Sequence, residues 1–253
     1  MPSTSPQPPS WADWLDAIAE QIKIANSAGT AAEHTTGEAI HLVRSSLKYA
    51  RALLRLAPPS IRRRAKWHGK NLQKIARRLS RFRDRSVLRE TIIGLSKDSQ
   101  IQLPDDLAQE EQRALDDAIH RLEKMRSQFS LIPHPNENPD LLLRRLKRFK
   151  NKMQRREPHD WRTATIAELH AYRSALIVHA CQVRFLCRVT GRPKKGYIEK
   201  IEKLRLRLGE INDLDRLILF SKQRRLQKRF NIDPSIVERA NRRQQKIRKK
   251  LQQ

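Results

Sequence analysis

The chain has 253 residues, a formal net charge of +27 and a sequence pI of about 11.1, so its partners are expected to be anionic: nucleic acid, acidic lipid or another polyanion. Hydrophobic residues make up 38% of the chain, which supplies a core if the elements are amphipathic and excludes a wholly disordered protein. No apolar run approaches roughly 18 residues, which excludes a transmembrane helix.

Periodicity and break signals predict helices throughout, so we expect an all-α fold. The first five helices are expected at residues 10–26, 36–56, 60–80, 84–95 and 104–129, and a proline-rich linker at 131–139 follows. Five more are expected at residues 140–156, 161–190, 197–208, 213–230 and 233–253. Ser10 and Asp13 form a variant of the capping box. Asp84 and Asp213 stand just before two predicted helices, so we expect them to be N-caps, and Asp215 could serve the same end.

The two halves share one register. A constant offset of 129 residues relates His41 to His170, Arg44 to Arg173, Arg55 to Arg184, Lys74 to Lys203, Arg78 to Arg207 and Asp84 to Asp213. One offset across several motifs predicts a duplicated helical unit. We therefore expect a single domain over residues 1–253, with an N-terminal repeat at 10–130 and a C-terminal repeat at 140–253. The two should pack as bundles related by a pseudo-twofold axis.

A cationic stripe dominates the predicted helix at 36–56. Residues 39–83 hold fourteen Lys or Arg and no Asp or Glu. Helical spacing aligns His41, Arg44, Lys48, Arg51 and Arg55 on one face. Like charges at this spacing repel one another, so the stripe makes sense if a polyanion neutralises it.

The helix at 60–80 carries a second stripe, opposite an apolar face; its cations are Arg63, Lys66, Lys70, Lys74, Arg77 and Arg81. Solvated basic faces are the alternative interpretation of both stripes. The helices at 140–156 and 233–253 are also basic, and for them a solvated surface is equally compatible. Alanines at Arg243 and Lys250 are therefore expected to weaken anion binding less than alanines in the first stripe.

The second half repeats this pattern incompletely. Ile177, Ala180, Glu199 and Leu206 replace cations of the first half, whereas Arg184, Arg188, Lys203 and Arg207 remain. His41 and His170, each one turn before an arginine, are interpreted as donors to phosphate oxygens. No acidic or Cys residue recurs at helical spacing from these two histidines, so a metal site is not favoured. Cys181 and Cys187 are six residues apart on one predicted helix and cannot comfortably form a disulfide there, so a reducing cytoplasm is expected.

These motifs resemble the CHAD family (conserved histidine α-helical domain). The resemblance rests on His41, Arg44, Lys48 and Arg51, on the segment Leu79–Leu88, and on a second copy at Leu169–Arg173 and Leu208–Asp215. It covers nearly the whole chain. It implies two helical bundles around a basic central cleft or channel, binding of inorganic polyphosphate, and association with polyphosphate granules.

Enzyme signatures are missing from the sequence. Gly69-Lys70 stands without a P-loop, His159-Asp160 is a lone dipeptide, and the E-x-E-x-K pattern of the CYTH tunnel enzymes is absent. We therefore expect no catalytic residue, no metal site and no cofactor. Phosphate oxygens are well suited to Lys and Arg, and aromatic residues at 5% are too few for base stacking.

The function predicted from the sequence is non-enzymatic polyphosphate binding in the cytoplasm. Non-specific nucleic acid is a further expected partner, and membrane insertion is not expected. The first alternative is a nucleic-acid- or ribosome-associated basic protein, and the second is a polyphosphate-metabolising enzyme. The predicted binding residues are His41, Arg44, Lys48, Arg51, Arg55, Lys70, Lys74, Arg77, Arg78, Arg81, His170, Arg173, Arg184, Lys203 and Arg207.

Overall fold

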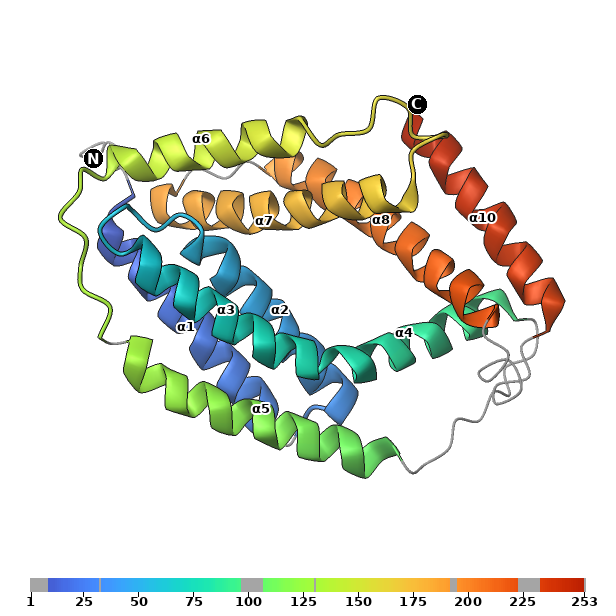
Figure 1. The fold of residues 1–253 in the computed structure, drawn as a ribbon, viewed down its shortest axis with the longest axis horizontal. Helices are drawn as coiled ribbons and strands as arrows, with labels where there is room; N and C mark the ends of the chain where they lie inside the picture. Colours follow the sequence, from blue (N-terminus) through green and yellow to red (C-terminus); the bar gives the residue numbers. More distant parts are fainter. Residues whose placement is uncertain are drawn as a thin grey trace, which may run out of the picture.

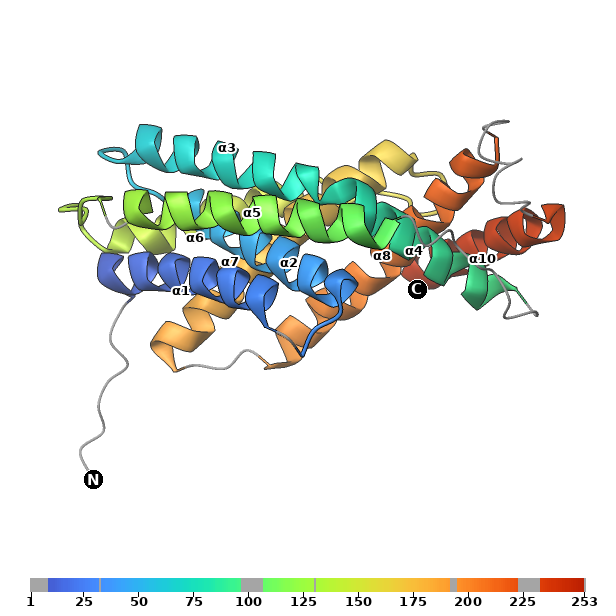
Figure 2. The ribbon, with the colours of Figure 1, turned by 90° about the horizontal axis from the view of Figure 1, so that it is seen from below.

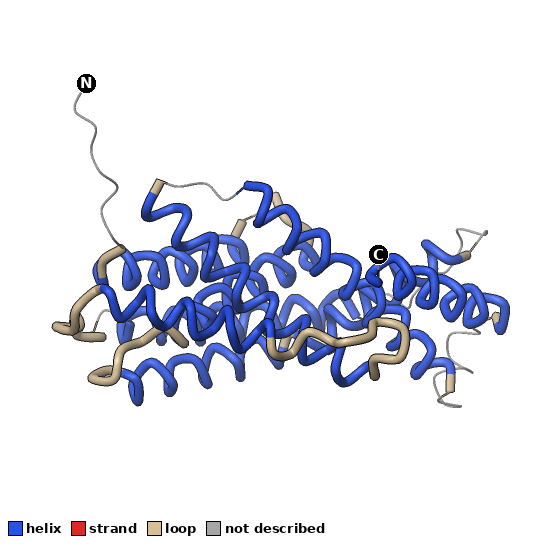
Figure 3. Tube along the Cα trace, turned by 90° about the horizontal axis from the view of Figure 1, so that it is seen from above, coloured by secondary structure: helices blue, strands red, loops and turns tan. Residues whose placement is uncertain are grey.

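The computed structural model describes residues 9–31, 33–96, 107–129, 131–191, 195–222 and 233–252. Those residues form nine helices and no strand, which confirms the all-α fold class (Figures 1 and 3). The helices are α1 (Trp11–Thr30), α2 (Thr36–Leu54), α3 (Arg62–Arg78), α4 (Ser80–Leu95), α5 (Leu107–Phe129), α6 (Asp140–Gln154), α7 (Ile166–Thr190), α8 (Lys195–Ser221) and α10 (Pro234–Gln252). No helix in the described residues has the length and apolar content to span a bilayer.

Local sequence signals set several helix ends. The capping box of Ser10 and Asp13 is present at the start of α1, as predicted. Thr35 with Glu38 and Thr165 with Glu168 form complete capping boxes before α2 and α7. Each box satisfies backbone N–H groups that the first helical turn leaves without partners. Gly191 ends α7 in the left-handed conformation, with φ 63°.

The N-cap interpretation of Asp84, Asp213 and Asp215 is wrong. Asp84 lies inside α4, and Asp213 and Asp215 lie inside α8, because the helices predicted at 197–208 and 213–230 are continuous from Lys195 to Ser221. Leu208, Ile211 and Leu214 are buried on one side of that helix, so tertiary packing outweighs the local cap signal. The end predicted at residue 230 and the start predicted at residue 104 lie outside the described residues.

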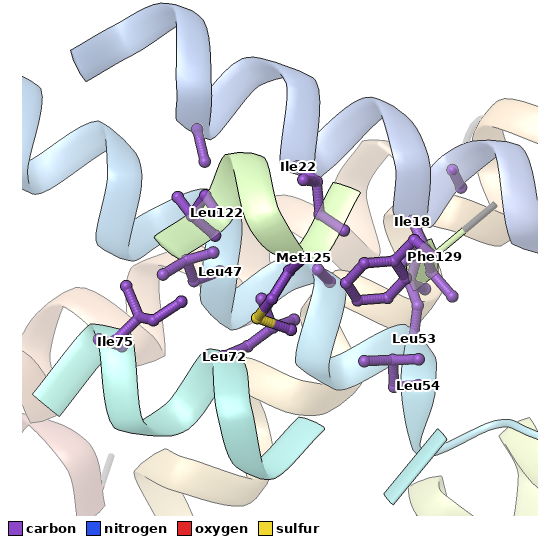
Figure 4. Close-up of a cluster of buried hydrophobic side chains, with 14 of the residues drawn as sticks. Ile18, Ile22, Leu47, Leu53, Leu54, Leu72, Ile75, Leu122, Met125 and Phe129 are labelled. Atoms are coloured by element: carbon purple, nitrogen blue, oxygen red, sulfur yellow. The ribbon is translucent and has the colours of Figure 1, made fainter. Parts of the chain in front are cut away.

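One hydrophobic cluster fills the space between α1, α2, α3 and α5 (Figure 4). Ile22, Leu47, Leu72 and Leu122 supply one residue from each of these helices, and all are almost fully buried. Trp14 lies fully buried at its edge, where its indole N–H donates to the Leu53 carbonyl at 2.8 Å. Figure 2 shows α1, α3 and α5 running alongside one another around this core.

A second cluster lies between α7, α8 and α10, and three helices join it to the first. Phe82 and Ile92, both on α4, belong to the first and second cluster respectively. The helix α6 also contributes residues to both clusters. On α7, Phe185 belongs to the first cluster and Tyr172 to the second. Figure 1 shows α4 leaving the end of α3 to reach α8 and α10. The two cores are therefore held together by shared helices.

Candidate functional site

Four helices bring cations together around Lys48. Its ammonium on α2 remains accessible to solvent but lies in the field of Arg44, Arg173, Arg83 and Arg205, from α2, α7, α4 and α8. Desolvation, followed by repulsion from these guanidinium groups, lowers the pKa of Lys48 to about 8. Such a concentration of positive charge is unfavourable in an empty site and favours binding of an anion.

Arg44 is held in place by the junction between α3 and α4. Its Nη1 donates to the Ala76 carbonyl at 2.5 Å and to the Ser80 hydroxyl at 2.6 Å. Burial lowers the pKa of Arg44, and Asp84 partly opposes that shift. Asp84 also pairs with Arg216, so one carboxylate inside α4 links α2 and α8 electrostatically.

Arg173 repeats this arrangement in the second half. Burial lowers its pKa, and Asp213 opposes the shift as Asp84 does for Arg44. The Arg173 Nε has no hydrogen-bond partner among the described residues, so a donor is left for a ligand. Gly209 lies beneath this guanidinium, because a Cβ at that position would come within 3.3 Å of Nη2.

A cavity of about 700 Å³ lies beside these cations, and we name it the α4–α8 cavity. Its ionisable lining comes from α2, α4, α7, α8 and α10: His41, Arg83, Glu90, Arg173, Lys203, Arg205, Arg207, Glu210, Asp213 and Arg243. Six Lys or Arg thus face three carboxylates. Arg83 Nη1 is buried with no partner among the described residues.

A neighbouring cavity of about 610 Å³ extends the first along α10, and we name it the α8–α10 cavity. The two share five lining residues, Gly94, Leu95, Arg207, Glu210 and Arg243, and the second adds Arg239, Arg242, Lys246 and Lys250. Arg243 pairs with Glu210. The basic face of α10 therefore forms part of the cavity walls. Alanine substitutions at Arg243 and Lys250 are for this reason unsuitable as controls distant from the site.

Four of the predicted binding residues line a different cavity; three of them lie on α3, and Arg81 lies on α4. Lys74, Arg77, Arg78 and Arg81 line a cavity of about 900 Å³ together with Glu110, Arg113, Ala114 and Asp117 of α5; this is the α3–α5 cavity. It contains no residue of α2. These four residues therefore lie apart from the lining of the α4–α8 cavity, because α3 buries Leu72 and Ile75 in the core and so turns its basic side toward α5.

The two histidines have different surroundings. His41 lines the α4–α8 cavity, and desolvation followed by Arg83 and Lys48 lowers its pKa, while Glu90 opposes the shift. His170 is exposed, with Nδ1 at 3.3 Å from Asn212 Oδ1, and it is not part of the cavity lining. Of these two histidines, which the 129-residue offset relates, only His41 lines the α4–α8 cavity.

Arg44 and Lys48 are not in the lining of the α4–α8 cavity, and the predicted binding residues not described above also lie outside it. Arg51 is half-buried near Arg55, and Arg55 is exposed. Lys70 is exposed on α3 and lines none of the three cavities. Arg184 pairs with Glu202 at 2.8 Å, so its charge is already compensated within the protein.

Three cations that line the α4–α8 cavity were not among the predicted binding residues: Arg83, Arg205 and Arg243. Arg83 lies in the acid-free run, and that signal could have found it, but its counterpart at the 129-residue offset is Asn212. Arg205 corresponds to Ala76, so the repeat offered no signal for it. Within the described residues, no group of His, Cys, Asp or Glu could hold a metal ion. Guanidinium, ammonium and imidazole N–H groups can together bind oxyanions by charge-assisted hydrogen bonds.

Comparison with known proteins identifies a family for most of the chain. Residues 16–220 match the CHAD domain family, which is well over half of the 253 residues. No curated protein and no solved structure matches the chain.

Proposed function

Because the chain belongs to the CHAD domain family, we propose that it binds inorganic polyphosphate, without turning it over, in the joined α4–α8 and α8–α10 cavities. One observation carries the proposal: six Lys or Arg from α4, α7, α8 and α10 line one cavity together with His41 of α2, and two of these arginines keep buried N–H groups without partners among the described residues. Unpaired buried donors are costly, and phosphate oxygens would satisfy them.

Polyphosphate suits this lining better than nucleic acid does. The ligand offers only oxygens, so guanidinium groups can grip two at once and lysines can act as mobile point charges. Stacking on single-stranded bases needs aromatic side chains, and no Phe, Tyr or Trp of the described residues lines the α4–α8 cavity. The second cavity along α10 lengthens the path, which suits a chain-like ligand. The same reasoning favours association with polyphosphate granules.

The proposal includes a duplicated architecture with two helical bundles. In its support, α2 and α7 begin with the same kind of capping box, Thr35 with Glu38 and Thr165 with Glu168. The electrostatic effect of Asp84 on Arg44 recurs as that of Asp213 on Arg173. An offset of 129 residues relates Arg44 to Arg173 and Asp84 to Asp213, and an offset of 130 relates the two capping boxes. Superposition of residues 10–129 on 139–253 is the direct check of this part.

Titration with long-chain polyphosphate at matched salt tests the binding site. The double variant Arg83→Ala/Arg173→Ala removes two lining cations from different helices. Charge-assisted hydrogen bonds contribute roughly 1.5–3 kcal/mol each, so affinity should fall well over tenfold. The matched control, Lys150→Ala/Lys152→Ala, removes two exposed charges of α6 that line none of the three cavities. Circular dichroism should show unchanged helicity in both. Equal losses of affinity would mean that diffuse charge binds the anion.

A further inference from the structure

The α3–α5 cavity has a counterpart in the other half, residue by residue. Its eight lining residues, moved by 129 positions, become Lys203, Leu206, Arg207, Glu210, Arg239, Arg242, Arg243 and Lys246. All eight of these line the α4–α8 cavity or the α8–α10 cavity. The same pair of helix faces, α3–α4 against α5 and α8 against α10, is thus hollowed at equivalent positions.

The two hollows share their charge as well as their position. Five cations face two carboxylates in the α3–α5 cavity, and six cations face one carboxylate at the equivalent positions. Arg78 is paired with Asp117 at 2.6 Å. Lys74, Arg77 and Arg113 form no salt bridge with any described residue, so their charges are open to an external anion.

The α3–α5 cavity is separate from the α4–α8 cavity. Among the described residues, none lines both cavities. The described lining residues of the first come from α3, α4 and α5, whereas those of the second come from α2, α4, α7, α8 and α10. A ligand bound in one therefore need not displace a ligand bound in the other.

We propose that the α3–α5 cavity is a second polyanion-binding site, so that one molecule holds two segments of a phosphate polymer at once. The ligand class rests on the proposed function, but the second site rests on its own lining. Two sites on one rigid scaffold would let the protein bridge separate chains or grip one long chain at two points, which raises the overall avidity.

Calorimetric titration with a short, defined-length inorganic polyphosphate measures the number of chains bound. The wild-type protein should bind two chains per molecule. The variant Arg77→Ala/Arg113→Ala, which alters exposed side chains only, should bind one chain, in the α4–α8 cavity. Arg83→Ala/Arg173→Ala should also bind one chain, in the α3–α5 cavity. Long chains should make the wild-type protein scatter light strongly through bridging, and either variant should scatter less.

Different failures have different meanings. A wild-type stoichiometry of one chain would overturn the second site, whether or not the Arg77→Ala/Arg113→Ala variant loses affinity, and would leave the proposed function standing. Two chains bound by that variant would also overturn it. Absence of polyphosphate binding by the wild-type protein would overturn the proposed function itself.

Discussion

Lys48 shows how the surroundings of one residue prepare it for an anion. Four arginines from α2, α4, α7 and α8 surround its ammonium, and no carboxylate appears among the groups that shift its pKa. Desolvation, followed by repulsion from Arg83 and Lys48, likewise lowers the pKa of His41. A bound polyanion would supply the missing negative charge and raise both pKa values, so binding and protonation are linked.

This linkage predicts a pH dependence of affinity. The pKa of Lys48 is about 8 in the empty protein, and a bound polyanion raises it, so binding above pH 8 takes up a proton. Affinity for polyphosphate should therefore be highest below pH 8 and fall as the pH rises through that value. Lys48→Arg keeps the charge at all these pH values and should bind with a flatter profile. Titration at constant ionic strength gives both profiles; identical slopes would exclude Lys48 as the titrating group.

At the scale of the helices, α7 reaches both hydrophobic clusters and also carries Arg173. Phe185 is fully buried in the first cluster, whereas its neighbour Arg184 is exposed. Gln182, also fully buried, donates to the Ala52 carbonyl of α2 at 3.0 Å. The position of Arg173 relative to Lys48 thus depends on how α7 packs against α2.

Phe185→Ala should lower the free energy of unfolding by about 3–5 kcal/mol, because it removes a buried aromatic ring and leaves a cavity. Arg184→Ala, one position away, is the control; it breaks a surface ion pair and should cost about 1 kcal/mol or less. Urea denaturation followed by circular dichroism measures both. Similar losses in the two variants would show that α7 does not pack as described.

Helix positions were predictable from the sequence where apolar periodicity was strong. The faces of α2 follow directly from the spacing of Val43, Leu47 and Ala50, all buried. The continuity of α8 was not predictable, since Asp213 resembles an N-cap and only burial of Ile211 and Leu214 outweighs that signal. The sequence also could not predict that the α3 stripe faces a different cavity from the one that His41 of α2 lines, because this depends on where α5 packs.

At the scale of the whole molecule, the charge of the sequence predicted a polyanion as partner, but not which residues meet. Arg83 on α4 and Arg205 on α8 both lie near Lys48, and their proximity depends on contacts between residues distant in sequence. The helices α4, α6 and α7 each contribute to both hydrophobic clusters. Those shared helices make the two clusters one cooperative structure.

Unfolding should therefore occur in a single transition. Trp14 reports on the first cluster and Trp161 on the second. Two variants test this, each keeping only one of these tryptophans and having the others changed to Phe. In urea, the fluorescence and the circular dichroism of each variant should change with the same midpoint. Fluorescence midpoints that differ from circular dichroism in either variant would indicate that the clusters unfold independently.

Competition between polyphosphate and DNA or RNA of equal charge, at physiological salt and with release of orthophosphate monitored, tests the central claim most directly. Net charge alone guarantees some affinity for any polyanion, so only the order of displacement distinguishes a polyphosphate site. We expect polyphosphate to displace nucleic acid, nucleic acid not to displace polyphosphate, and no phosphate to be released. Displacement of polyphosphate by DNA or RNA, or release of orthophosphate, would contradict non-enzymatic polyphosphate binding.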